Sequence, residues 1–308
     1  MLKATMKSRI QSIKVKSGQI VHVLREDELH PEISGNKWRK LKYNVIKAKE
    51  EGYDKLLTFG GAFSNHIAAT AAAGSEYDID TVGVIRGEFD PENPTLKFAR
   101  SRGMELHFVS RTEYRERGSK AFTAQLRRKH GSFFEIPEGG ANYYGIAGCM
   151  EIPGTLPEAF DYVILACGTG STLAGMVAAA GDKIKKKVLG IPVLKTSDAL
   201  RGDIDKQLWK VFLDDELVAE YAGKYVTFND FHFGGYAKYN EELLEFMSVC
   251  KREYDLPLDV VYTAKAFYGL TRLLERGYFR ESDRILFVHT GGLQGNEGMS
   301  YLHGIEFV

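Results

Sequence analysis

The chain has 308 residues, of which 44% are hydrophobic, enough for one large domain or two smaller ones. Lys plus Arg and Asp plus Glu both total 41, so no global basic field favours nucleic acid or an anionic membrane as a partner. The widely spaced Cys149, Cys167 and Cys250 indicate neither a disulfide framework nor a zinc site, and no other metal site is expected. A signal peptide and a stretch of about 20 apolar residues are both missing, so we expect a soluble, cytoplasmic protein.

The hydrophobic pattern predicts an α/β protein with two open, mainly parallel sheets. Residues 10–27 alternate polar and apolar side chains around Ser17-Gly18, which predicts a hairpin. Beyond it, short apolar runs typical of buried strands alternate with segments of helical period. The expected strands are 56–59, 81–85, 105–109, 132–136, 162–167, 188–194, 225–228 and 285–289. The expected helices are 64–74, 94–102, 112–130, 172–182, 240–253 and 264–276. The basic run KIKKK at 183–187 is interpreted as the solvated end of a helix.

Residues 33–43, ISGNKWRKLKY, place four cationic side chains behind a loop-forming Gly-Asn pair. Arg39, Lys40 and Lys42 are expected to be ordinary surface residues. Lys37 follows the loop directly, so it is either another surface lysine or a lysine placed for chemistry. Three glycine loops further along the chain help to decide between these two roles of Lys37.

The first glycine loop lies in TFGGAFSNHIAATAAAG, residues 58–74, where an expected strand runs through Gly-Gly into a helix. Ser64 or Asn65 at this point can cap free backbone N–H groups. Capping needs only one such residue, and Ser64, Asn65 and His66 stand together, so a ligand-facing role is an equally open interpretation. The G-x-S-x-G spacing of a serine hydrolase is missing.

The second loop follows an apolar strand and consists of Gly168, Thr169, Gly170, Ser171 and Thr172. Glycines allow backbone N–H groups to converge on an anion, and the N-terminus of the next helix adds a favourable partial charge. The loop therefore predicts a phosphate site rather than a plain tight turn. A dinucleotide fits less well, because the next strand leads to Lys195 where an acidic ribose ligand would be needed.

The third loop begins with His289-Thr290-Gly291-Gly292 and is a weak signal alone. Together the three loops suggest a cofactor with one phosphate and a small polar group. A lysine amine beside a phosphate-bearing aldehyde forms a Schiff base, which is how pyridoxal 5′-phosphate (PLP) is held. Forming this Schiff base would be the chemical role of Lys37.

These residues resemble the fold-type II, tryptophan synthase β-like PLP enzymes of the 1-aminocyclopropane-1-carboxylate (ACC) deaminase / D-cysteine desulfhydrase family. The resemblance extends from about residue 10 to about residue 300. Seven motifs stand in family order: SGNKWRKL, GGAFSNH, GGAN (139–142), CGTGSTLAG, FGGYAKYNEE (233–242), VYTAKAFYGL (261–270) and HTGG.

The resemblance implies that Lys37 holds PLP covalently as a Schiff base and moves protons at the substrate carbon. Asn65 would hydrogen-bond the ring hydroxyl of the cofactor. Ser64 would contact the substrate carboxylate or act as a nucleophile, with Asn65 and His66 also on the substrate side. Residues 168–172 would bind the phosphate.

The resemblance also assigns two tyrosines and a ring partner, and here the sequence departs from one branch of the family. Tyr236 and Tyr262 match the two active-site tyrosines. True ACC deaminases follow the second tyrosine with a glutamate that pairs with the pyridine nitrogen, whereas this chain has Thr263. Thr290 stands where desulfhydrase-like members hold that nitrogen with a hydroxyl. The segments 237–240 and 293–296 differ from the desulfhydrase pattern, and Phe63 is expected to narrow the pocket.

The sequence thus predicts a PLP-dependent lyase most like D-cysteine desulfhydrase, which converts a small amino acid to a 2-oxo acid and ammonia by β-elimination. The alternatives are an ACC deaminase, which opens the ring to 2-oxobutanoate and ammonia, a non-catalytic PLP-binding protein, and a nicotinamide oxidoreductase. The resemblance further implies a homodimer, a large PLP domain from residues 1–48 and 158–308, and a smaller domain, 49–157, that closes over the substrate.

Overall fold

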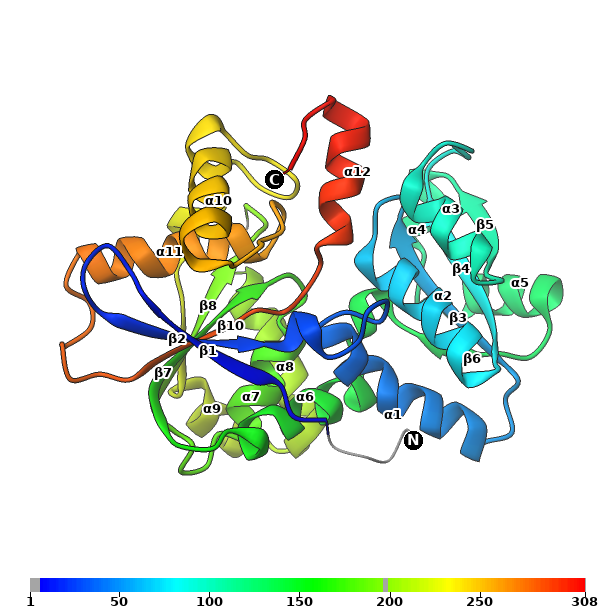
Figure 1. The fold of residues 1–308 in the computed structure, drawn as a ribbon. Helices are drawn as coiled ribbons and strands as arrows, with labels where there is room; N and C mark the ends of the chain where they lie inside the picture. The colour runs from blue at the N-terminus through cyan, green and yellow to red at the C-terminus, as the bar shows by residue number, and fades with distance from the viewer. Residues whose placement is uncertain (1–5, 196–198, 308) are drawn as a thin grey trace.

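The computed structural model describes residues 6–195 and 199–307, and its strands in these ranges form two mainly parallel sheets, as Figure 1 shows. The six-stranded sheet has the order β1 (Arg9–Lys14), β2 (Ile20–Arg25), β10 (Ile285–Val288), β7 (Phe160–Cys167), β8 (Ile184–Pro192) and β9 (Tyr225–Thr227). The four-stranded sheet has the order β5 (Glu105–Val109), β4 (Asp80–Arg86), β3 (Lys55–Gly61) and β6 (Phe134–Ile136). The predicted α/β class with two such sheets is confirmed.

The predicted hairpin is also confirmed, since β1 and β2 pair antiparallel, with Lys14 opposite Ile20. Strand β2 then pairs in parallel with β10, which pairs in parallel with β7. The six-stranded sheet is therefore built from both ends of the chain, whereas all strands of the four-stranded sheet come from residues 55–136.

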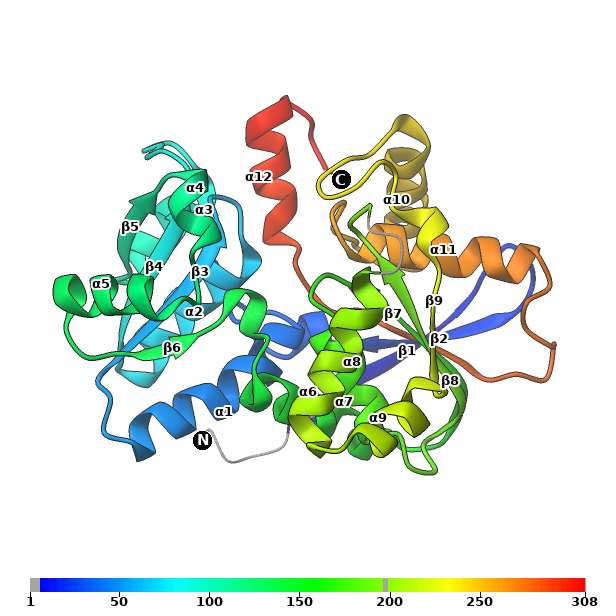
Figure 2. The same ribbon diagram turned by 180° about the vertical axis from the view of Figure 1, so that it is seen from behind.

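Helices cover both faces of each sheet (Figures 1 and 2). Those in the described ranges are α1 (Asn36–Glu50), α2 (Asn65–Tyr77), α3 (Pro94–Ser101), α4 (Arg111–Arg115), α5 (Lys120–His130), α6 (Tyr143–Thr155), α7 (Ser171–Ala178), α8 (Ala199–Phe212), α9 (Asp215–Ala222), α10 (Glu241–Tyr254), α11 (Thr263–Glu275) and α12 (Gln294–His303). In both views α12 stands between the two sheets. None of these helices combines the length and apolar character that a membrane span requires.

Successive side chains of each central strand point to opposite faces of its sheet, and helices cover both faces. In β7, Ile164 packs with α10 and α11, while Val163 and Leu165 pack with α6, α7 and α8. In β3, Leu57 packs with α4 and α5, while Leu56 packs with α1 and α2. Strands that are buried on both faces are continuously apolar, which is the pattern the sequence carries.

Two local predictions were wrong. The expected helix 112–130 is two helices, because Gly118 takes a left-handed backbone (φ +84°) and Ser119 then caps α5 by accepting a bond from the backbone N–H of Phe122. The run KIKKK does not end a helix; it enters strand β8, with Lys185 and Lys186 exposed. Lys186 is held there by an ion pair with Asp283.

Helices α1 and α6 pack unusually closely, and this contact fixes the helix that carries Lys37. A Cβ added to Gly148 of α6 would lie 1.8 Å from the backbone oxygen of Arg39 in α1. No side chain can be accommodated at that distance, so glycine is required for the two helices to meet.

We expect Gly148→Ala to lower the free energy of unfolding by about 1–3 kcal/mol or more, because the added methyl group must push α6 away from α1. Gly154→Ala in the same helix is the matched control, since an added Cβ there meets no atom within 4 Å. That variant should be neutral or stabilised by about 0.5–1 kcal/mol. Urea unfolding of both variants makes the comparison; equal stabilities would show that α1 and α6 adjust freely.

Candidate functional site

The glycine loops meet at one edge of the large sheet, where β7 and β10 end. Gly35 has a φ of +63°, and a Cβ there would lie 2.0 Å from the backbone oxygen of Thr290. The backbone N–H of Asn36 donates to that same oxygen at 3.1 Å. The start of α1 therefore lies directly against the third loop, at the carboxyl edge where open α/β sheets bind ligands.

The predicted phosphate loop joins the same group of segments. The side-chain amide of Asn36 donates to Thr172 Oγ1 at 3.0 Å, and the hydroxyls of Thr169 and Ser171 lie 2.9 Å apart. A Cβ on Gly168 would lie 3.3 Å from the ring of Tyr262. The loop is thus held between the lysine motif on one side and Tyr262, one of the two predicted active-site tyrosines, on the other.

Lys37 is the second residue of α1; the residue is half-buried, and its amine lies in a desolvated setting. Burial, with a further contribution from the nearby Lys40 charge, lowers the pKa of Lys37 well below its ordinary value. A lysine amine in this setting is unprotonated, and therefore nucleophilic, at lower pH than an exposed lysine.

The expectation that Arg39, Lys40 and Lys42 are surface residues was wrong, since all three are buried. Lys40 donates to the backbone oxygen of Gly139 at 3.2 Å, and burial lowers its pKa too. The other two turn away from the site and are neutralised by carboxylates: Arg39 pairs with Glu26 at 2.8 Å and Lys42 with Glu151 at 2.6 Å.

Ser64 and Asn65 lie at the start of α2, across from the lysine motif. Ser64 Oγ accepts bonds from the backbone N–H groups of His66 and Ile67, so its capping role is confirmed, while its own proton stays available to a ligand. The Asn65 amide lies 3.5 Å from the backbone oxygen of Gly292 in the third loop. Phe63 packs on α12, where a Cβ on Gly298 would meet its ring at 2.6 Å.

His66 lies beneath this loop, 2% exposed, with Nε2 2.9 Å from Thr58 Oγ1. Because the Thr58 hydroxyl donates to the backbone oxygen of Ile136, it must accept from His66, which places the imidazole proton on Nε2. Burial and the charges of Lys37 and Lys40 lower the pKa of His66, so the ring is neutral. Its Nδ1 is a buried acceptor with no partner among the described residues.

The two tyrosines contact each other edge to face, with ring centroids 6.0 Å apart. Burial raises the pKa of Tyr262 well above its ordinary value. The pKa of Tyr236 is also raised by desolvation, although the residue is 44% exposed. Tyr236 stands in a strained loop, in which Phe233 (φ +53°) and Ala237 (φ +55°) take left-handed conformations. Lys265 of α11 holds this loop.

The Lys265 side chain is fully buried and donates from Nζ to the backbone oxygens of His232, at 3.0 Å, and Gly235, at 2.7 Å. Burial lowers the pKa of Lys265 to about 8. This residue falls within the VYTAKAFYGL motif, but the local sequence pattern alone does not distinguish it from an ordinary helix lysine.

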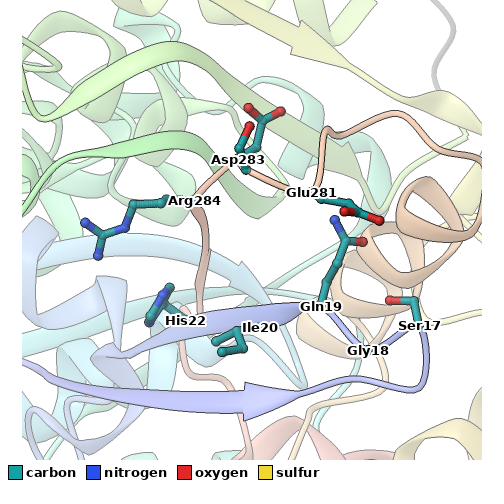
Figure 3. Close-up of a pocket in the computed structure, with 9 residues that line it drawn as sticks. Ser17, Gly18, Gln19, Ile20, His22, Glu281, Asp283 and Arg284 are labelled. Carbon is teal, nitrogen blue, oxygen red and sulfur yellow. The ribbon is translucent and has the colours of Figure 1, made fainter.

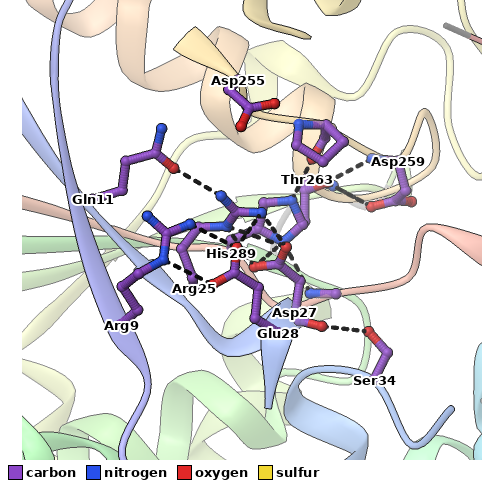
Figure 4. Close-up of polar contacts among 12 residues, drawn as sticks. Arg9, Gln11, Arg25, Asp27, Glu28, Ser34, Asp255, Asp259, Thr263 and His289 are labelled. Carbon is purple, nitrogen blue, oxygen red and sulfur yellow. Dashed lines mark hydrogen bonds and ion pairs between the residues drawn. The ribbon is translucent and has the colours of Figure 1, made fainter. Parts of the chain in front are cut away.

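Thr290 is backed by a buried polar network (Figure 4). The ring of His289 lies between Asp27, at 3.4 Å, and the backbone oxygen of Pro257, at 2.6 Å. Arg25 pairs with the same Asp27 carboxylate at 2.7 Å. The Thr290 hydroxyl itself makes no hydrogen bond to the described residues, so it is available to a ligand.

Thr263, which stands where ACC deaminases carry a glutamate, is committed elsewhere. Its hydroxyl donates to Asp259 Oδ1 at 2.8 Å and accepts from the Asp259 backbone N–H at 2.8 Å (Figure 4). Asp259 is fully buried and also accepts bonds from the backbone N–H groups of residues 261–263. Thr263 therefore organises the start of α11.

A different hollow, of about 480 Å³, lies at the opposite edge of the large sheet (Figure 3). Ile20, at the start of β2, and Arg284, just before β10, line it. It therefore lies at the amino ends of these strands, away from the glycine loops.

The residues at the carboxyl edge fit PLP. Gly168 and Gly170 leave the loop without side chains. An added Cβ on Gly168 would lie 3.3 Å from Tyr262, and one on Gly170 would lie 2.6 Å from Ile204. The buried Lys37 amine suits an aldehyde, and Thr290 offers a hydroxyl. The profile described as "Pyridoxal-phosphate dependent enzyme" matches residues 9–291 of the chain. The chain belongs to this family.

Comparison with individual relatives shows which PLP-dependent enzymes the chain is similar to. The chain is 31% identical, over 300 residues, to the bifunctional D-cysteine desulfhydrase/1-aminocyclopropane-1-carboxylate deaminase, mitochondrial, of Arabidopsis thaliana, covering 91% of this chain and 74% of that one. It is 26% identical to D-cysteine desulfhydrase of Serratia proteamaculans (strain 568), covering 94% and 91%. The crystal structure of an ACC deaminase homologue superposes with a TM-score of 0.80 at 27% identity, covering 95% and 91%. The ACC deaminase / D-cysteine desulfhydrase resemblance is confirmed.

We expect the cofactor-free PLP enzyme to gain stability as pH rises between the lowered pKa of Lys37 and the value of about 10.4 for an unfolded chain. Within this window the unfolded chain binds the proton and the folded chain does not. Lys37→Met removes that difference, so it should stabilise the cofactor-free protein most at the acidic end of the window.

Thermal unfolding midpoints from about pH 7 to about pH 10 measure this effect. Lys129→Met, at an exposed position of α5, is the control and should follow the wild type. Parallel curves for wild type and Lys37→Met would contradict the burial of the amine.

We expect Lys265→Met to loosen the loop that carries Tyr236, because two backbone oxygens lose their donor at a cost of about 1–3 kcal/mol each when buried. Amide hydrogen exchange at 232–237 should quicken. Lys238→Met, which changes an exposed lysine of the same loop, should leave the exchange unchanged. Equal exchange in both variants would mean that the loop holds its shape without Lys265.

Proposed function

We propose that the protein is a PLP-dependent lyase that converts a small amino acid to a 2-oxo acid and ammonia by β-elimination. Its similarity to proteins named D-cysteine desulfhydrase supports this proposal. The desolvated Lys37 amine, next to Asn36, which bonds both the HTGG loop and the predicted phosphate loop, carries this proposal. The division at residues 49 and 157, the homodimer and the cytoplasmic location stay predictions.

Lys37 is proposed to hold the cofactor covalently and then to act as the base. When bound, PLP supplies an electron sink for negative charge at the substrate α-carbon. Because burial lowers the pKa of Lys37, its amine is free to take the α-proton near neutral pH. Lys40, bonded to the Gly139 oxygen, keeps a second positive charge near this amine and so favours its neutral form.

Tyr236 and Tyr262 are proposed to serve as acids. Both phenols have pKa values raised above the ordinary value, so both are protonated at neutral pH, and each has a proton that it can donate to the departing β-substituent. Ser64 has a hydroxyl proton for the substrate carboxylate, and Asn65 has its side-chain amide for the cofactor ring. A contact to the substrate through His66 Nδ1 stays a prediction.

The surroundings of Thr290 favour β-elimination over ring opening. A carboxylate beside the pyridine nitrogen would stabilise a protonated ring and a strong electron sink, whereas a threonine hydroxyl leaves the ring closer to neutral. Thr263 cannot replace the missing glutamate, because its hydroxyl is bonded to Asp259. A weaker sink suffices when the β-substituent leaves with its electron pair, and a cyclopropane has no such group. The names of the relatives support ACC deaminase equally, so it is the second candidate.

The covalent link is tested by Lys37→Ala. After treatment with borohydride, the wild type should retain cofactor through a denaturing gel filtration, and Lys37→Ala should lose it, because the amine that forms the bond is gone. Lys40→Ala, which removes the neighbouring amine, should still retain it. A reducible adduct on Lys37→Ala would refute the assignment of Lys37.

The substrate is tested by measuring 2-oxo acid release from D-cysteine and from ACC with the PLP-loaded protein. We expect pyruvate from D-cysteine and no 2-oxobutanoate from ACC, because Thr290 is a neutral ring partner. Turnover of ACC would establish the second candidate. If the protein binds PLP but releases no 2-oxo acid from any amino acid, the non-catalytic alternative gains support.

A further inference from the structure

A second pocket, of about 340 Å³, lies at the carboxyl edge of the small sheet and is rich in positive charge. Its lining consists of Arg86, Arg111, Tyr114, Arg115 and Arg117, and we call it the arginine pocket. No acidic residue is among these five. None of these five residues takes part in the proposed β-elimination.

The arginine pocket is placed by the ends of three neighbouring strands. Arg86 is the last residue of β4 and pairs with Gly61 at the end of β3 and with Val109 in β5. Gly61 leads into the turn before Ser64, and Val109 leads into α4, which carries Arg111 and Arg115. The pocket thus opens at the sheet edge that also bears the Ser64 loop.

Two of the guanidinium groups, those of Arg86 and Arg117, lie over a buried ring. Tyr114 is 2% exposed, and the Arg86 and Arg117 Cζ atoms lie 5.5 Å and 4.7 Å from its ring centroid. Arg111 and Arg115 are four residues apart in α4, so they lie on the same side of that helix.

All four arginines are exposed to solvent, and most of their charge has no partner among the described residues. Arg117 pairs with Glu138 at 2.9 Å, but Arg86, Arg111 and Arg115 form no ion pair with any described residue. Like charges that converge on one small pocket repel one another, and a bound anion relieves this repulsion. Guanidinium groups match the paired oxygens of carboxylate, phosphate and sulfonate groups.

The pocket borders the proposed active site from two sides. A Cβ on Gly61 would lie 3.7 Å from Arg86 Nη2, so this guanidinium reaches the turn that precedes Ser64. Glu138, the partner of Arg117, is followed by Gly139, where a Cβ would lie 3.1 Å from Thr169 of the phosphate loop.

We propose that the arginine pocket binds an anionic group at the far end of the substrate side chain, so that the preferred substrate is an amino acid with a second acidic group. This inference rests on the proposed function, and it names a substrate class that the relatives' names do not. The altered segments 237–240 and 293–296 agree with a substrate other than D-cysteine or ACC.

A matched pair of substrates tests the proposal: S-carboxymethylcysteine and its neutral amide, S-carbamoylmethylcysteine, each as both enantiomers. In either case the α-proton is lost, the Cβ–S bond breaks with the electron pair leaving on sulfur, and one water is consumed overall to give pyruvate, ammonia and the thiol. We expect the holoenzyme to favour the acid in kcat/KM by at least about tenfold, the size of a charge-assisted hydrogen bond.

Arg86→Gln and Arg115→Gln should each reduce this preference toward one, and the matched control Arg128→Gln, on the exposed side of α5, should keep it. Equal kcat/KM values for acid and amide in the wild type would overturn the proposal. A preference that survives both pocket variants would also overturn it, because the charge would then be recognised elsewhere.

A binding measurement separates this proposal from the proposed function. Glutamate and glutamine differ in charge and have no β-leaving group, so their binding to the holoenzyme, followed by cofactor absorbance, requires no turnover. Tighter binding of glutamate, lost in Arg86→Gln, supports the pocket even if no amino acid yields a 2-oxo acid. Pyruvate release with equal binding of glutamate and glutamine would leave the lyase standing and refute the pocket.

Discussion

The site depends on the backbone contact between Gly35 and Thr290. Only a residue without a Cβ, in a left-handed conformation, allows the start of α1 to lie against the end of β10. The Asn36 backbone then bonds the Thr290 oxygen while its side chain bonds Thr172. One dipeptide thus fixes the start of α1, which carries Lys37, relative to both the predicted phosphate loop and Thr290.

The cationic residues of α1 lie on two faces of the helix, and the charges around these two faces differ. Lys37 and Lys40 are three residues apart and lie together near the site, where burial lowers the pKa of both. Arg39 and Lys42, also three apart, are instead neutralised by buried carboxylates. The helix can therefore carry several buried charges while the Lys37 amine forms no ion pair with a carboxylate of the described residues.

Much of the fold could be predicted because its strands are buried on both faces and its ligand loops need glycine. The strands and the loop that contains Gly168 follow from such local patterns. The burial of Arg39 could not, because its partner Glu26 and the Gly148 contact come from segments distant in sequence. Lys265 was missed for the same reason, since its acceptors lie in the loop of Tyr236. Helix α6, packed between α1 and α7, lacks the polar stripe that makes a helix recognisable.

The order of strands also sets the order in which the chain can complete its sheets during synthesis. All four strands of the small sheet are contiguous in the chain and can pair once residue 136 has emerged from the ribosome. Strand β2 must wait for β10, because Val21 pairs with Ile285. Since Thr290 follows β10, the edge proposed to bind the cofactor is assembled last, and a nascent chain carries Lys37 for most of its synthesis without the HTGG loop.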